Sequence, residues 1–196
     1  MIAPAETRLV LARHGETAWS KSSQHTGRTD IPLTDLGREQ ARHLGTVLAG
    51  RTFNRVLTSP LVRASETARL AGFGDGIAVD PDLQEWDYGI YEGRTRAEIL
   101  PEVPGWSVWT HPMIDGESLA ALAVRADRVI ATLLPTGGDV LVVSHGHFLR
   151  ELATRWIEMA PAEAARLELW TATISELGWE HDNRVIEVWN AAPAGA

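Results

Sequence analysis

The chain has 196 residues, 44% of them hydrophobic, and a formal net charge of −8 from 18 Lys and Arg against 26 Asp and Glu. This length predicts one domain over residues 1–196. The negative charge argues against binding to nucleic acid or to an anionic membrane through a general electrostatic field. The absence of Cys excludes disulfides, thiolate catalysis and Cys-ligated zinc, and it fits a reducing, cytoplasmic compartment. We expect neither a signal peptide nor a membrane-spanning helix.

Strands and helices alternate in the first half of the chain. An apolar run at Arg8–Ala12 predicts a buried strand, and the polar stretch after it predicts a loop as far as Thr34. Thr34 is the expected N-cap of a helix that runs to about Gly50, because apolar residues recur there at helical spacing. The order continues with a strand, a helix opened by proline and a strand, which are Asn54–Thr58, Pro60–Ala71 and Ile77–Asp80.

The second half begins with a segment of different character. Several Pro and Trp interrupt residues 86–116, which predicts an irregular, lid-like excursion with one short helix at Thr95–Leu100. Gly116-Glu117-Ser118 then leads into a long helix to about Leu134. The expected elements after it are a strand, a helix, three further strands and a frayed tail, which are Asp139–Ser144, His147–Met159, Arg166–Thr171, Thr173–Trp179, Arg184–Trp189 and Ala191–Ala196.

These elements define a fold class. Strands separated by helical crossovers predict a mostly parallel sheet with helices on both of its faces. We therefore expect an α/β fold, a three-layer α/β/α sandwich with a mostly parallel central sheet and a β-rich C-terminal edge. In open sheets of this kind ligands bind at the carboxyl ends of the strands, so candidate site residues are sought there.

Residues suited to phosphoryl transfer follow three of the predicted strands. Arg13 and His14 end the first, Arg63 lies at the helix start after the second, and His145 follows the Asp139 strand. A neutral imidazole is a nucleophile that can accept a phosphoryl group. Arg forks match phosphate oxygens, and a protonated His145 would add positive charge. Glu85 would protonate the leaving group and activate water, so this chemistry needs no metal and no other cofactor.

Some of these residues also have a purely structural interpretation. An isolated His14 would most simply be a hydrogen-bonded core histidine, but the matching Arg and His residues favour catalysis. Glu85 could instead form a structural ion pair. Gly15 and Gly146 would let backbone N–H groups approach the phosphate oxygens. The remaining histidines have no metal-ligand spacing, and among them we expect His147 alone to reach the pocket. Four Trp predict packing of the core and lid, namely Trp86, Trp106, Trp109 and Trp156.

Five segments, in chain order, resemble the motifs of the histidine phosphatase superfamily, also called phosphoglycerate-mutase-like. They are RHGETAWSKSSQHTGRTDIPLTDLG at 13–37, SPLVRASET at 59–67, LQEWDYGIYEG at 83–93, GES at 116–118 and VVSHGHFLR at 142–150. The resemblance implies His14 as phosphoryl acceptor and Glu85 as acid and base. It implies Arg13, Arg63 and His145 as phosphate ligands. Further substrate contacts that it implies are Ser20, Thr26, Gly27 and Tyr88.

The chain departs from the mutase branch of this family. The segment from Glu85 to Gly116 is shorter than in the cofactor-dependent mutases and lacks the paired arginines that hold a phosphoglycerate carboxylate there. Ser20 and the run TAWSKSSQHTGRTD are more similar to the branch that contains sedoheptulose-bisphosphatase and broad acid phosphatases.

The function predicted from the sequence is therefore hydrolysis. We expect a metal-independent phosphatase that hydrolyses small phosphate monoesters, sugar phosphates above all, through a phosphohistidine on His14. Its expected partner is a small phosphorylated metabolite, and the formation of a homo-oligomer is possible from the sequence. Two alternatives are a cofactor-dependent phosphoglycerate mutase and a catalytically idle module that binds phosphate or another protein.

Overall fold

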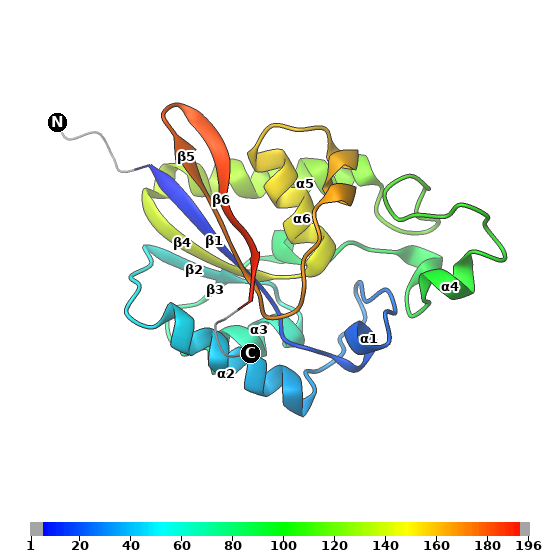
Figure 1. Ribbon diagram of the computed structural model, residues 1–196, viewed down its shortest axis with the longest axis horizontal. Coiled ribbons are helices and arrows are strands. Elements are labelled where there is room, and N and C mark those ends of the chain that lie inside the picture. Colours follow the sequence, from blue (N-terminus) through cyan, green and yellow to red (C-terminus); the bar gives the residue numbers. More distant parts are fainter. Residues whose placement is uncertain (1–5, 193–196) are drawn as a thin grey trace.

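A six-stranded sheet forms the centre of the molecule (Figure 1). The structure is a computed structural model and describes residues 6–192. The strands lie in the order β3-β2-β4-β1-β5-β6. The first four pair in parallel, whereas β5 and β6 are antiparallel. Their bounds are β1 (Thr7–Arg13), β2 (Arg55–Thr58), β3 (Ala78–Val79), β4 (Gly138–Ser144), β5 (Ile174–Glu180) and β6 (Asn183–Ala191).

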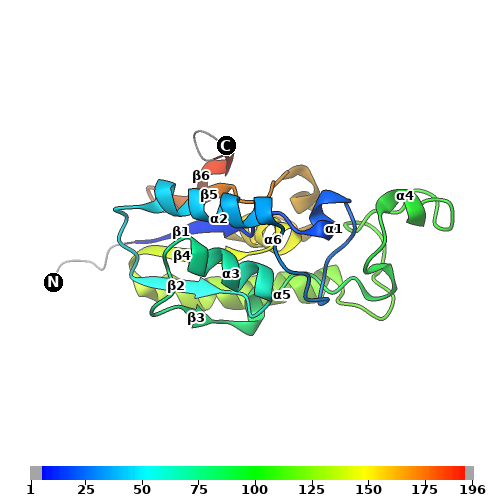
Figure 2. The same ribbon diagram turned by 90° about the horizontal axis from the view of Figure 1, so that it is seen from below.

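Helices cover both faces of this sheet. One face carries α2 (Asp35–Leu48) and α3 (Val62–Leu70), and the other carries α5 (Leu119–Leu133) and α6 (Gly146–Trp156) (Figures 1 and 2). Within residues 6–192, none of the helices combines the length and apolar character needed to cross a bilayer. The shorter helices are α1 (Ala18–Lys21), α4 (Arg96–Ile99) and the 3₁₀ turns Pro81–Leu83, Gly89–Tyr91, Leu134–Thr136 and Pro161–Arg166.

Alternate residues of β1 supply two separate hydrophobic cores. Leu9 and Leu11 pack in the larger cluster, with residues of α5 and α6. Val10 and Ala12 point to the opposite face and pack in the cluster of α2 and α3. A strand buried on both faces must be apolar at every position, which explains the continuous apolar run in the sequence. The predicted three-layer α/β/α sandwich with its mostly parallel sheet is confirmed.

One predicted strand of the tail is wrong. Residues Arg166–Thr171 form no strand: a 3₁₀ turn ends at Arg166, and the chain then runs without regular structure until β5 begins. The backbone groups there are bonded by side chains instead of a neighbouring strand. The carbonyl of Leu169 accepts from Arg13, and the N–H of Trp170 donates to Asn190. The side chains of an extended segment alternate between two sides whether or not the segment pairs with another strand. Its sequence pattern is therefore the same as that of a strand.

Smaller differences concern the ends of elements. The segment predicted as loop contains α1, in which Thr17 and Ser20 form a capping box around a single helical turn. A helix of four residues is too short to show apolar periodicity in the sequence. The predicted short helix at 95–100 is confirmed as α4, with Thr95 as its N-cap. Ala191 belongs to β6, and residues 193–196 of the predicted frayed tail lie outside the described residues.

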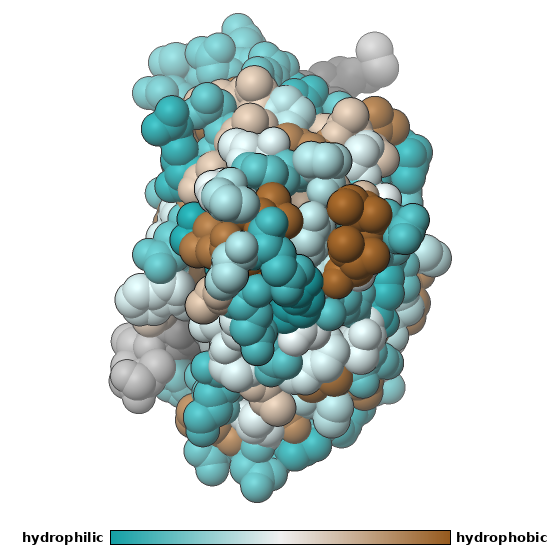
Figure 3. Space-filling model, turned by 90° about the vertical axis from the view of Figure 1, so that its right-hand side faces the viewer, coloured by the Kyte–Doolittle hydropathy of each residue, from teal (hydrophilic) through white to brown (hydrophobic). Residues whose placement is uncertain are grey.

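The excursion over residues 86–116 packs its large rings into the core. Trp86, Trp106 and Trp109 are buried and join the same cluster as the residues of α5 and α6. Trp156 is buried as well, so the prediction that these four rings pack in the interior is confirmed. The excursion, which includes α4, lies next to α1 at one end of the molecule (Figure 2). On the surface of this end, separate hydrophobic patches, coloured brown, lie among hydrophilic side chains (Figure 3).

The packing of α5 gives a stability prediction. Leu122 is 0% exposed in the larger core, whereas Val124 on the same helix is 56% exposed. Leu122→Ala should lower the free energy of unfolding by about 2–5 kcal/mol, because it removes buried methyl groups and leaves a cavity. Val124→Ala should change it by less than about 0.5 kcal/mol. Urea unfolding followed by circular dichroism measures both, and equal effects would contradict the described face of α5.

Candidate active site

The candidate active site lies at the carboxyl ends of β1 and β4. The parallel register of these strands pairs Arg13 with Ser144, so the residues that follow them, His14 and His145, emerge side by side. Their ring centroids are 5.1 Å apart. Sequence reasoning placed both histidines at strand ends, and the structure brings them together in one site.

The imidazole of His14 is held in one tautomer. Its Nδ1 lies 2.7 Å from the carbonyl oxygen of Gly15, which can only accept, so Nδ1 carries the proton and donates. The ring is 4% exposed, and burial lowers its pKa well below 6.5. The positive charges of Arg63 and Arg13 lower this pKa further. His14 is therefore neutral at neutral pH, and Nε2 carries the lone pair of a nucleophile.

His145 is neutral as well, which corrects the expectation of a second imidazolium. Nε of Arg63 donates to Nδ1 of His145 at 3.1 Å, and a guanidinium nitrogen cannot accept. The proton of the imidazole is therefore on Nε2, which lies 2.7 Å from Oγ of Ser59. Burial lowers the pKa of His145 well below 6.5, and Arg63 lowers it further. The sequence could not show this charge state, because it depends on a contact between distant residues.

Arg63 is a buried cation that is bonded wholly within the protein. Besides His145, its guanidinium donates to the carbonyls of Thr29, Thr26 and Gly27, at 3.0, 3.2 and 2.8 Å. Each of its three nitrogens thus has an acceptor, as a desolvated guanidinium requires. Arg63 and His145 do not line the cavity beside His14. The ring of His145 lies next to that of His14, and the charge of Arg63 lowers the pKa of His14.

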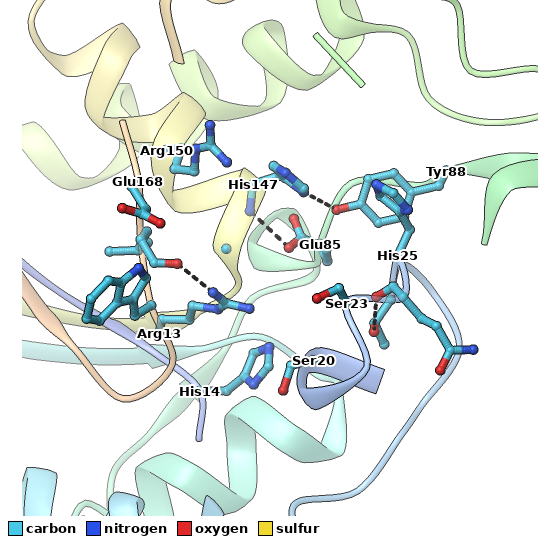
Figure 4. A pocket seen from close by; sticks show the side chains of 15 residues that line it. Arg13, His14, Ser20, Ser23, His25, Glu85, Tyr88, His147, Arg150 and Glu168 are labelled. Atoms are coloured by element: carbon cyan, nitrogen blue, oxygen red, sulfur yellow. Dashed lines mark hydrogen bonds between the residues drawn. The ribbon is translucent and has the colours of Figure 1, made fainter. Parts of the chain in front are cut away.

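Arg13 is the cation that faces the cavity next to His14 (Figure 4). Its Nη1 donates to the carbonyl of Leu169 at 2.5 Å, while its buried Nε has no hydrogen-bond acceptor among residues 6–192. A buried donor without a partner is unfavourable, so this nitrogen suits an anionic oxygen of a ligand. Burial lowers the pKa of Arg13 from its ordinary value, and the charge of Glu85 opposes this effect.

Of the two glycines beside the histidines, Gly15 does not have the free N–H group that the sequence predicted, whereas Gly146 lies at the cavity. The N–H of Gly15 donates to Oγ1 of Thr67 at 3.1 Å and is therefore engaged within the protein. Gly146 lines the cavity, and a Cβ at this position would lie 3.2 Å from Cζ of Arg13. Glycine at 146 thus lets the guanidinium of Arg13 lie against the start of α6.

Glu85 accepts hydrogen bonds at the N-terminus of α6. Its Oε1 accepts from the N–H groups of Trp86 and Phe148, at 2.9 and 2.8 Å, and its Oε2 accepts from the N–H of His147 at 3.0 Å. A helix N-terminus is a favourable position for a carboxylate. Because Oε2 accepts one of these bonds and Oε1 accepts two, Oε2 keeps a lone pair that can bind a proton. Glu85 lines the cavity, as general acid and base catalysis requires.

Sequence reasoning missed the residue that holds the backbone around Glu85. Arg125 is buried in α5 and donates to the carbonyls of Gln84 and Glu85, at 2.6 and 3.4 Å. It also forms a two-bond ion pair with Glu117, at 2.8 and 2.6 Å. An Arg on the apolar face of a long helix was the available signal, because a buried guanidinium implies several acceptors.

Three of the four further substrate contacts predicted from the family line the cavity, namely Ser20, Thr26 and Tyr88. Gly27 does not, because its carbonyl holds Arg63 beneath the surface. The hydroxyl of Tyr88 bonds to Nδ1 of His147 at 2.5 Å, and burial raises the pKa of Tyr88 well above 10. His147 reaches the cavity as predicted, but His25 lines it too, so the expectation that His147 alone would do so is wrong.

The cavity has a volume of about 330 Å³. Figure 4 shows His14 below Arg13, with Arg150 and Glu168 on one side and Tyr88 and His25 on the other. Within residues 6–192, His, Asp and Glu side chains form no group of three that could hold a metal ion. The lining residues that the sequence did not predict are Ser23, Gln24, His25, Arg150, Glu168, Leu169 and Trp170.

Comparison with known proteins identifies the family. A model of the histidine phosphatase superfamily (branch 1) matches residues 9–192. An acid phosphatase of Mycobacterium tuberculosis is 45% identical over 185 residues, which cover 92% of this chain and 91% of that protein. Sedoheptulose 1,7-bisphosphatase of Saccharomyces cerevisiae is 34% identical over 181 residues, which cover 76% and 67%. A Yersinia enterocolitica protein named "Probable phosphoglycerate mutase GpmB" is 30% identical over 201 residues, which cover 96% and 92%.

Comparison with solved structures agrees with this family assignment. A solved structure of an open reading frame from Mycobacterium tuberculosis superposes with a TM-score of 0.90 at 43% sequence identity, and the match covers 95% of this chain and 98% of that chain. The ordered motifs identified in the sequence therefore lie in the fold in which the family carries them. The chain belongs to the histidine phosphatase superfamily and is a phosphoric monoester hydrolase.

Proposed function

We propose that this enzyme hydrolyses small phosphate monoesters, sugar phosphates above all, through a phosphohistidine on His14 and without a metal ion. The observation that carries the proposal is the fixed tautomer of His14. Its Nδ1 proton is bonded to the carbonyl of Gly15, so Nε2 is the ring atom with a free lone pair. A buried, neutral imidazole next to an Arg with an unpaired donor fits nucleophilic attack on phosphorus.

In the first step Nε2 of His14 attacks phosphorus, and the bond from phosphorus to the ester oxygen breaks. Glu85 enters this step protonated and gives its proton to the leaving oxygen, which departs as an alcohol. Arg13 donates to the phosphoryl oxygens, and the charge of the buried Arg63, which acts on His14, stabilises them as well. Positive side chains thereby take the role that metal ions have in other phosphoryl-transfer enzymes.

In the second step water attacks the phosphorus of phosphohistidine. Glu85, now a carboxylate, accepts the proton of the attacking water, and the bond from phosphorus to Nε2 breaks. Inorganic phosphate leaves, His14 is neutral again, and Glu85 is protonated for the next cycle. Oε2 of Glu85, which keeps a free lone pair, suits both roles, and the N–H groups at the start of α6 fix the carboxyl group at the cavity.

The mutase alternative requires cationic groups that hold the carboxylate of the phosphoglycerate during reorientation. The cations of the 86–116 excursion are engaged elsewhere. Arg94 pairs with Glu102 at 2.5 Å, and Nε of Arg96 donates to the carbonyl of Trp106 at 3.2 Å. Of residues 86–116, Tyr88 alone lines the cavity. An intermediate without such a clamp leaves before a second transfer, and water completes the reaction.

The proposed role of His14 as phosphoryl acceptor gives the central test. His14→Asn should lower kcat for p-nitrophenyl phosphate by roughly a thousandfold or more, because no other residue accepts the phosphoryl group. The matched variant His181→Asn, in an exposed turn, should retain wild-type turnover. Wild-type enzyme should work in EDTA, and alkaline quenching should trap phosphohistidine on the wild type alone. Normal turnover by His14→Asn, or activity that EDTA abolishes and Mg²⁺ restores, would refute the mechanism.

The depressed pKa of His14 gives a pH prediction. His14 must be unprotonated to attack, and its folded pKa lies well below 6.5, so the acid limb of kcat/KM should lie below pH 6.5. Arg63→Met removes one of the charges that lower this pKa, so its acid limb should move to higher pH. Profiles from about pH 4 to pH 8 with one substrate measure the difference, since ionisation of the substrate affects both enzymes equally. Coincident acid limbs would contradict the proposed coupling.

The lack of a carboxylate clamp gives a third prediction. Phosphate release from a panel of sugar phosphates should be much faster than conversion of 3-phosphoglycerate to 2-phosphoglycerate with the bisphosphoglycerate primer present. Coupled assays for 2-phosphoglycerate and for inorganic phosphate, run in parallel, measure the two rates. Mutase turnover that exceeds hydrolysis of every sugar phosphate tested would favour the alternative function.

A further inference from the structure

One edge of the cavity is a short segment with an unusually constrained backbone. We call residues Glu168–Trp170 the rim segment; all three line the cavity. Each of them has a backbone group bonded to a side chain from elsewhere in the chain, at 2.5–2.9 Å. These side chains belong to Trp189, Arg13, Asn190 and Thr173. The side chains of Glu168 and Trp170 are therefore presented at the cavity from a rigid backbone.

The indole of Trp170 is exposed although the other large rings near the site are buried. It is 59% exposed, whereas Trp86, Trp106 and Trp109 lie in the core. The hydrogen bonds of residue 170 use only its N–H and its carbonyl, so its backbone geometry does not depend on the indole. A flat apolar ring that a hydrogen-bonded backbone presents at a cavity is suited to stacking against a ring of a ligand.

The same edge carries one charge of each sign. Arg150 and Glu168 both line the cavity and lie on the same side of it (Figure 4). Arg150 donates from Nε and Nη2 to the carbonyl of Ala164 and lies 4.7 Å over the ring of Trp109. Among residues 6–192, its Nη1 has no acceptor. Burial lowers the pKa of Arg150 to about 10, so the guanidinium stays charged at neutral pH beside the carboxylate of Glu168.

We propose that the rim segment and Arg150 form a subsite for the leaving group, and that this subsite selects an uncharged, hydroxyl-bearing ring such as that of a sugar. The C–H face of the ring stacks on Trp170, while Glu168 accepts and Arg150 donates hydrogen bonds to its hydroxyls. Because Glu168 offsets the charge of Arg150, a second phosphate or a carboxylate of a ligand gains little binding free energy there. The subsite thus favours sugar monophosphates over bisphosphates and phosphocarboxylates. This inference rests on the proposed phosphatase function and names its leaving group.

The test compares three substrates of the purified enzyme: glucose 6-phosphate, fructose 1,6-bisphosphate and ethyl phosphate, which has no ring. For Trp170→Ala, the ratio of kcat/KM for glucose 6-phosphate to that for ethyl phosphate should fall by about 3- to 10-fold. Trp170→Phe keeps an aromatic face and should restore most of that ratio. The control Met159→Ala, which truncates an exposed apolar side chain remote from the cavity lining, should leave the ratio at the wild-type value.

The charge of Glu168 is tested by its isosteric amide. Glu168→Gln should raise kcat/KM for fructose 1,6-bisphosphate relative to glucose 6-phosphate by at least about threefold, because the charge of Arg150 is no longer offset. Glu163→Gln removes one negative charge from a position that does not line the cavity and should leave this preference as in the wild type. Unchanged ratios in Trp170→Ala and Glu168→Gln, with ethyl phosphate still hydrolysed, would overturn the subsite alone. A wild-type enzyme that hydrolyses none of the three would overturn the proposed function as well.

Discussion

A buried guanidinium sets the arrangement of this active site. Arg63 is fully buried, and removing a charge of this kind from water is tolerated only when acceptors surround it. The carbonyls of Thr26, Gly27 and Thr29 supply them, so the polar loop after β1 wraps around this side chain. The loop in turn brings Ser20 and Thr26 to the cavity. A segment without apolar periodicity is thereby ordered in part through its own backbone carbonyls.

The same guanidinium determines the protonation of both histidines. Its Nε fixes the tautomer of His145, and its charge helps to keep His14 neutral. The positive charge next to His14 therefore resides on the guanidinium groups of Arg63 and Arg13, which stay protonated over the whole physiological range, and not on imidazoles. The cavity can attract a phosphate group and offer it a neutral nucleophile at the same time. An imidazolium at position 14 would supply charge, but His14 would then lack the lone pair that reacts.

Much of this could be predicted from the sequence. Continuous apolar runs predicted the buried strands β1 and β4. The motifs and their places after strands predicted that His14, Arg63, Glu85 and His145 lie at one end of the sheet. The charge of His145 and its hydrogen bond from Arg63 could not be predicted, because they follow from a contact between residues 82 positions apart. The rim segment was mistaken for a strand for a related reason. Its alternating pattern is real, but the partners of its backbone are side chains of distant residues.

The hydrogen bond from Arg13 to the carbonyl of Leu169 connects the two halves of the cavity. This bond joins Arg13, which faces the cavity, to the backbone that presents Trp170, so the fold limits the distance between them. In the proposed subsite, the phosphate of a substrate and its ring must span that distance to engage both. Selection there would act on the length of the arm between phosphorus and ring as well as on chemistry: too short an arm leaves the ring off the indole, and too long an arm carries the ring past it.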